Sequence, residues 1–186
     1  MYNIFIGMDL GAKAGISVIN GDIMLSHEAK FGGKEEPLKY KKFWDHICEI
    51  FDTYETYKPI VFYEYVARHL GTKAAHAYGA YRMILLMACH DRGIPCKELS
   101  VQAIKKAATG KGAAKKDIMI ESATNRFKPD WKLTDNEADS MWIAYLGREI
   151  TLESFEANES SGPLRAFKRN GSVPHDTYRK RVSKKD

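Results

Sequence analysis

Three short apolar runs near the start of the chain restrict its fold more than any other feature. They span residues 3–9, 15–20 and 23–31, and a turn at Asn20-Gly21 joins the second run to the third. An Asn-Gly turn between two apolar runs is typical of a β-hairpin. We therefore predict three consecutive strands, each antiparallel to the one before it.

Extended and helical patterns alternate in the rest of the chain. Apolar residues recur at helical spacing from Lys39 to Tyr54, and Gly93 and Pro95 end a long segment rich in Ala and Met. The patterns predict helices over 39–54, 73–92, 101–109, 113–126 and 135–148 and strands over 59–64 and 95–99. The predicted fold class is α/β, with a mixed five-stranded sheet (three antiparallel strands, then two parallel) and helices on both faces.

The net charge of +5 is concentrated near the end of the chain. Residues 163–186 contain eight Lys or Arg and two Asp, so the remaining residues carry a net charge of −1. We predict one domain over 1–150 and a basic extension over 151–186. The sequence leaves open whether this extension is flexible or ordered. A polyanion-binding arm and a solvated tail without a partner are the alternatives for this extension.

Membrane and disulfide-bonded proteins are both disfavoured. No stretch approaches the roughly 20 apolar residues of a membrane span, and the first residues lack a signal-peptide pattern, so we expect a cytoplasmic protein. Cys48, Cys89 and Cys96 are odd in number and have no metal-ligand spacing. We interpret them as reduced thiols in the core.

Four acidic residues stand where apolar elements end or begin. Asp9 closes the first apolar run, Glu64 closes the run at 60–63, and Asp135 and Asp139 lie one helical turn apart. Buried carboxylates are costly unless a cation compensates them. Hard oxygen ligands gathered from two strands and a helix are typical of a Mg²⁺ site that acts on phosphates.

Each acid also has a simpler interpretation. Asp9 could be a turn residue before Gly11, and Glu64 could form an ion pair with Arg68. Thr134 and Glu137 have the spacing of a capping box, in which an acid at 135 favours the helix N-terminus through its dipole. That interpretation leaves Asp139 unexplained, because Asp139 lies at the margin of the apolar face in the second turn.

A second basic block lies before these last acids. It contains no acidic residue and consists of Lys105, Lys106, Lys111, Lys115 and Lys116. A solvated helix face is one interpretation of this block, and contact with phosphates is the other. A nucleotide-binding loop is disfavoured because Gly110-Lys111-Gly112 lacks the glycine spacing and the terminal Gly-Lys-Ser/Thr.

Four motifs in this order resemble a known family. They are Gly7-Met8-Asp9-Leu10-Gly11, Phe62-Tyr63-Glu64-Tyr65, the segment from Thr109 to Lys116, and Asn136-Glu137-Ala138-Asp139-Ser140. Together they are similar to the RuvC-type Holliday-junction resolvases, which are RNase H-like nucleases, over about residues 3–148. The size points to a compact, phage-like or bacterial branch, and hence to the cytoplasm of a bacterium or an infected host.

The resemblance implies a metal site with two Mg²⁺ ions, for which Mn²⁺ is expected to substitute. Asp9 would bridge both ions, Glu64 would hold one and Asp139 the other. The fourth ligand is either Asp135 or Asn136. We favour Asp135, because a carboxylate neutralises a divalent cation and a carboxamide does not.

The resemblance also implies an activity, which is paired nicking of four-way junctions with 5′-phosphate and 3′-hydroxyl products. Lys105 and Lys116 match basic positions close to the active site, and Lys116 would stabilise charge on the scissile phosphate. The residues expected to contact DNA are Lys105, Lys106, Lys111, Lys115, Lys116, Arg68 and Tyr65. A broader branched-DNA nuclease acting on forks, flaps or RNA-DNA hybrids and a catalytically silent branched-DNA binding protein are the alternatives.

Two further features follow from the family. Its members often have an aromatic residue three positions after the Glu, where this chain has Ala67, which makes an inherited cleavage preference doubtful. The helix at 73–92 corresponds to the family's dimer helix, and a two-fold junction favours a homodimer. The candidate dimer face, which could instead be core, consists of Ala74, Ala77, Tyr78, Tyr81, Leu85 and Ala88.

Overall fold

The computed structural model describes residues 2–33, 35–69 and 71–160, without the side chains of 156–160. Residues up to Leu152 form one compact unit, which contains the whole sheet, and a second unit begins at Glu153. The elements are β1 (Ile4–Asp9), β2 (Lys13–Asn20), β3 (Ile23–Lys30), α1 (Glu36–Thr53), β4 (Pro59–Tyr65), α2 (Thr72–Asp91), β5 (Cys96–Ser100), α3 (Val101–Thr109), α4 (Lys116–Phe127) and α5 (Asp135–Ser160).

The five strands form one mixed sheet in the order β3-β2-β1-β4-β5. β1, β2 and β3 are antiparallel to their neighbours in this series, whereas β4 runs parallel to β1 and β5 runs parallel to β4. Gly21 has a φ of 60° in the turn between β2 and β3, as the Asn-Gly signal predicts. The predicted α/β class and mixed sheet are therefore confirmed.

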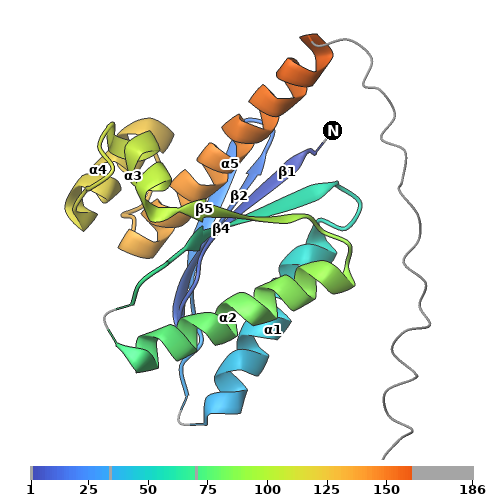
Figure 1. Ribbon diagram of the computed structural model, residues 1–186, viewed down its shortest axis with the longest axis vertical. Coiled ribbons are helices and arrows are strands. Elements are labelled where there is room, and N and C mark those ends of the chain that lie inside the picture. Colours follow the sequence, from blue (N-terminus) through green and yellow to red (C-terminus); the bar gives the residue numbers. More distant parts are fainter. Residues whose placement is uncertain (1, 34, 70, 161–186) are drawn as a thin grey trace, which may run out of the picture. The chain divides into compact units, whose positions relative to one another are not determined.

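Helices cover both faces of this sheet (Figure 1). Alternate strand residues such as Ile6 and Val61 pack with Phe43 of α1 and Leu85 of α2 in one core cluster. The opposite residues, such as Phe62, pack with α3, α4 and α5 in a second cluster. Because strand side chains alternate, Asp9 and Glu64 lie on the α5 face of the sheet.

Glycines let α5 approach the sheet closely. A Cβ on Gly7 of β1 would lie 2.3 Å from the carbonyl oxygen of Ser140, and one on Gly15 of β2 would lie 1.8 Å from that of Asn136. Neither position can therefore carry a larger residue without moving the helix. This contact places the first two turns of α5 directly over the ends of β1 and β2.

Several helix boundaries differ from the predicted ones. α1 begins at Glu36 rather than at 39, because Pro37 is well tolerated in a first helical turn. α4 begins at Lys116 rather than at 113. α5 continues past 148 to Ser160, and neither Gly nor Pro interrupts it between 148 and 160. The basic segment 163–186 lies outside the described residues.

The three cysteines are free thiols. Cys89 is buried in the core, whereas Cys48 and Cys96 are only half-buried, so the expectation of core thiols is met in full by Cys89 alone. Among the described helices, none combines the length and apolar character needed to cross a membrane.

Candidate active site

Two of the predicted acids lie side by side at the end of neighbouring parallel strands. Met8 of β1 is paired with Tyr63 of β4, so the next residues along each strand, Asp9 and Glu64, are neighbours. Both residues are half-buried beneath α5. The two strands therefore bring together carboxylates that are 55 residues apart in the sequence.

The capping box sets the start of α5. The backbone amide of Glu137 donates to Thr134 Oγ1 at 3.2 Å, and the amide of Thr134 donates to Glu137 Oε2 at 2.9 Å. Trp131 Nε1 donates to the other carboxylate oxygen of Glu137 at 3.1 Å. These bonds confirm the predicted helix start and give Asp135 and Asp139 their positions one turn apart.

The acids from the sheet and from α5 form one electrostatic cluster. Burial, followed by the charges of Glu64, Asp139 and Asp135, raises the pKa of Asp9 to about 8. Burial and Asp139 raise the pKa of Glu64 to about 6, and burial and Asp135 raise the pKa of Asp139 to about 6. The carboxylates repel one another in a poorly solvated place, which is the situation that a bound cation relieves.

Two lysines face this cluster, and they are the two that the family resemblance singles out. Lys116 Nζ forms an ion pair with Asp135, which lowers the pKa of Asp135 and raises the pKa of Lys116. The charge of Lys105 opposes the rise in the pKa of both Glu64 and Asp139. The side chain of Lys116 is 80% exposed, so its ammonium remains accessible from solvent.

The other predicted DNA-contact residues lie on the surface of the protein. Lys106, Lys111 and Lys115 are exposed, and Gly110, with a φ of 75°, turns the chain between α3 and α4. Tyr65 is 39% exposed, and the centre of its ring lies 5.6 Å from the guanidinium carbon of Arg82. Arg68 is exposed and forms no ion pair with Glu64, so the simpler interpretation of Glu64 is not met.

An additional acid, Glu28 of β3, was not predicted from the sequence. Asn136 Nδ2 donates to Glu28 Oε2 at 2.8 Å. Glu28 is paired with Gly15, and Gly15 is paired with Asp9, so Glu28 and Asp9 flank the glycine on which Asn136 rests. The hairpin turn at Asn20-Gly21 carries the signal that could have found it, because that turn determines which residues of β2 and β3 are paired.

The donor set of this site suits a hard divalent cation. It offers carboxylate oxygens with raised pKa values, a carboxamide and two balancing lysines, and oxygen ligands of this kind are the ones that Mg²⁺ and Mn²⁺ prefer. Within the described part of the chain, no group of three His, Cys, Asp or Glu side chains is already arranged to hold an ion. The chemistry of the residues therefore fits a metal, although their side chains do not form a preassembled coordination group.

Solved structures share this arrangement of strands and helices. No protein-family model matches the sequence, and a comparison with curated proteins finds no match. A structure of Thermus thermophilus RuvC in complex with a Holliday junction substrate has a TM-score of 0.71 and 16% identity, over 82% of this chain and 97% of that one. The chain has the RuvC fold. A second Thermus thermophilus RuvC structure gives a TM-score of 0.69 and 17% identity, over 81% and 96% of the two chains.

The RuvC fold extends over nearly the whole length of both solved chains, so the similarity is one of complete domains. The predicted RNase H-like sheet is thereby confirmed. Because the sequence identities are so low, the shared fold does not by itself assign an activity or a site to this chain.

In the candidate dimer face of α2, Ala74 is exposed and Ala77 and Tyr78 are half-buried, whereas the other three residues are core, as the alternative interpretation allowed. Tyr81, Leu85 and Ala88 are buried in the core cluster beneath the sheet, so this side of the helix belongs to the core. The side that faces solvent carries Met83 and Met87, which are 54% and 51% exposed. Apolar residues occur on both sides of α2, which is why periodicity alone did not separate the two sides.

Proposed function

We propose that the chain is a metal-dependent DNA endonuclease that resolves four-way junctions by paired symmetric nicks. One observation carries the proposal. Asp9, Glu64 and Asp139 come from three separate elements, burial and a neighbouring acid raise the pKa of each, and two lysines face them. A catalytically silent DNA-binding protein gains nothing from such a cluster, because carboxylates repel phosphates. The RuvC neighbour bound to a Holliday junction supports the choice of substrate.

In this proposal Asp9, Glu64 and Asp139 hold the metal ions. Two Mg²⁺ ions at such a site supply an activated water and stabilise the leaving 3′ oxygen, with products that carry 5′-phosphate and 3′-hydroxyl ends. The protein contributes the negative charge that attracts the ions. Burial keeps this charge poorly solvated, so the free protein has a strong preference for a bound cation or a proton.

For the fourth ligand, the contacts favour Asn136 over Asp135. Asp135 is already the ion-pair partner of Lys116, so binding a metal would require it to leave that lysine. The amide nitrogen of Asn136 is held by Glu28, and the amide oxygen of the same group points away from that bond. Glu28 therefore acts as a positioning residue, as outer-shell carboxylates do for other metal ligands.

The lysines bind the DNA backbone. Lys116 lies at the edge of the acid cluster with its ammonium exposed, where it can neutralise charge on the scissile phosphate. Lys105 balances Glu64 and Asp139 from a different element, α3. Lys106, Lys111 and Lys115 are exposed around the turn between α3 and α4 and contact flanking phosphates, which position the strand without reading its sequence.

Paired nicking requires two active sites related by two-fold symmetry. We place the dimer contact on the solvent side of α2, where Gly79, Met83 and Met87 form an exposed stripe at helical spacing. A glycine lets two helices approach closely, and methionines fill irregular gaps between them. This face replaces the one predicted from the sequence.

The test is cleavage of an end-labelled immobile four-way junction in Mg²⁺, beside duplex, fork, flap and RNA-DNA hybrid substrates. Paired nicks in the junction alone support the proposal. Equal cutting of all branched substrates supports a broader branched-DNA nuclease. Junction binding without any cutting in Mg²⁺ or Mn²⁺ would leave only a binding protein.

A further inference from the structure

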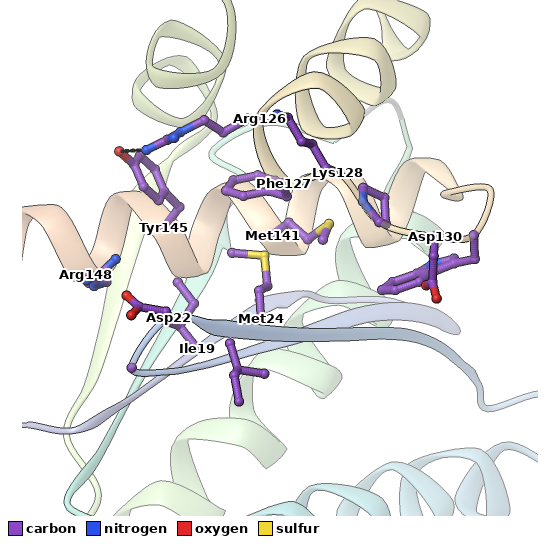
Figure 2. Close-up of a pocket in the computed structure, with 14 residues that line it drawn as sticks. Ile19, Asp22, Met24, Arg126, Phe127, Lys128, Asp130, Met141, Tyr145 and Arg148 are labelled. Atoms are coloured by element: carbon purple, nitrogen blue, oxygen red, sulfur yellow. Dashed lines mark hydrogen bonds between the residues drawn. The ribbon is translucent and has the colours of Figure 1, made fainter.

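A cavity distinct from the acid cluster lies between the β2–β3 hairpin, the end of α4 and the middle of α5. Its volume is about 380 Å³. In Figure 2, Met24 of the hairpin points toward Met141 and Phe127 of the helices, with Ile19 to its left beside Asp22. The floor of the cavity is therefore apolar, with Met141 buried and Met24 half-buried, and a polarisable methionine surface suits a flat group.

Three cations surround this apolar interior. Arg126, Lys128 and Arg148 come from α4, the residue that follows it, and α5 (Figure 2). In the part of the chain that the structure describes, none of the three forms an ion pair with a carboxylate, although Asp22 and Asp130 also line the cavity. The rim thus has a surplus of positive charge that an anion would complement.

Two aromatic rings beside the cations are held through their polar atoms. Arg126 donates an Nη2 proton to the hydroxyl of Tyr145 at 2.8 Å, and its guanidinium carbon lies 4.9 Å from the centre of that ring. Trp131 is 40% exposed, yet its indole nitrogen is bonded to Glu137. Trp131 is fixed in this way but open to solvent, so it offers a stacking surface at low entropic cost, whereas Tyr145 is half-buried against Phe127 and Trp142 and forms the wall beside it.

The cavity lies on the same face of the sheet as the acid cluster. Ile19 is paired with Phe5, which is four residues before Asp9, so the two places are about 13 Å apart along β1. α4 connects them, because Lys116 at its start faces the acids and Arg126 near its end lines the cavity. A DNA strand that passes the acids can therefore follow α4 to the cavity.

We propose that this cavity binds an unpaired nucleotide of a DNA strand that extends beyond the cleavage site. The base enters beside Tyr145 and Trp131, over Met24 and Met141, while the cations of the rim hold the adjoining phosphates. A paired duplex offers only its phosphates here, since its bases are stacked inside the helix. The inference rests on the proposed nuclease function and extends it, because it favours branched substrates that have a single-stranded segment.

The decisive experiment compares two junctions in buffer with EDTA, where no strand is cut. One junction is blunt, and the other carries a single-stranded extension of about ten nucleotides on one arm, within the site size of known single-strand binders. We expect the extension to tighten binding by about fivefold or more. The Arg126→Gln/Lys128→Asn double variant should lose this gain and leave binding of the blunt junction unchanged. Lys128 has a φ of 50°, in the left-handed region. Asn is chosen as its replacement because Asn adopts this conformation more readily than most other residues.

A matched control shows that the loss is local. Lys42 and Lys58 are exposed on other parts of the chain, and the Lys42→Gln/Lys58→Gln variant removes the same charge. It should retain the full gain from the extension. Equal melting temperatures of the three proteins exclude misfolding as the cause. An extension without effect on the wild type, or a gain that survives the cavity variant, would overturn the proposal.

Two further readouts show whether a nucleotide occupies the cavity itself. With 5-iododeoxyuridine in the extension, photocrosslinking should label Trp131 or Tyr145, and labelling confined to other peptides contradicts the site. Polyglutamate and oligothymidine are each tested as competitors of the extended junction. If polyglutamate competes as well as oligothymidine, the cavity is a general anion site instead of a nucleotide site. Cleavage of the blunt junction in Mg²⁺ is scored separately, so failure of the nuclease proposal is distinguished from failure of the cavity.

Discussion

Replacing Asp9 with Asn should stabilise the metal-free protein at alkaline pH. In the folded protein the pKa of Asp9 lies at about 8, against an ordinary value of 3.8. Because the folded pKa is the higher one, the native state binds a proton that the unfolded state releases. Stability therefore falls as the pH rises between these two values and reaches a plateau above about 8. The carboxamide of the Asp9→Asn variant carries no charge and removes this loss.

The size of the effect follows from the pKa shift. Each pKa unit corresponds to about 1.4 kcal/mol, so a shift from 3.8 to about 8 sets an upper limit of roughly 6 kcal/mol. Two factors make the real effect smaller than this limit. Glu64 and Asp139 share the repulsion and also hold protons below a pH of about 6. Local relaxation of the structure relieves part of the cost of burying the charge. We expect a net gain of about 2 kcal/mol at about pH 8.5 and less than about 0.5 kcal/mol at about pH 4.5.

Urea unfolding in EDTA at these two pH values measures the difference directly. Glu55→Gln, at an exposed turn position, is the control for the loss of one carboxylate and should give no comparable gain. Added Mn²⁺ should stabilise the wild type at the alkaline pH and have little effect on the Asp9→Asn variant. A variant that is no more stable than the wild type at the alkaline pH, or a gain independent of pH, would refute the electrostatic account of the site.

Four other predictions address separate parts of the structure. Asp139→Asn should leave junction binding within about twofold and abolish cleavage in a gel assay, since only the metal site loses charge. Glu28→Ala should weaken Mn²⁺ binding, measured by calorimetry, by about tenfold or more, whereas Glu28→Gln, which can still accept from Asn136, should largely retain it. Thr134→Ala should cost about 1 kcal/mol in urea unfolding through loss of the cap, and Thr134→Ser should cost much less. Met83→Glu/Met87→Glu should yield monomers in sedimentation experiments, whereas a dimer that persists would exclude the solvent side of α2.

Local signals predicted their parts of the structure well. The capping box at Thr134 and Glu137 forms with both expected bonds, and Ser100 accepts from the amide of Ala103 as an N-cap. These features depend on residues three positions apart, so the sequence contains everything needed to form them. The convergence of Asp9, Glu64 and Asp139 was also predictable, because parallel strand ends and a helix start meet at one edge of the sheet.

Contacts between distant segments were not predictable in the same way. Glu28 and Asn136 are 108 residues apart, and only the strand register combined with the position of α5 brings them together. In the cavity, Arg126 and Lys128 are two positions apart, but Arg148 and the β2–β3 hairpin come from separate segments, so no local pattern reveals the whole set. The choice between the two faces of α2 depended on which one meets the core, and apolar residues occur on both.

The most direct test of the central claim maps the nicks in an immobile four-way junction, labelled in turn on each of its strands. In Mg²⁺ the wild-type protein should cut two opposite strands at symmetric positions and leave products that a ligase can join. Asp139→Asn should bind the same junction and leave every strand intact. A wild-type protein that leaves the junction uncut in both Mg²⁺ and Mn²⁺, or a variant that cuts as well as the wild type, would contradict the assignment of the acid cluster.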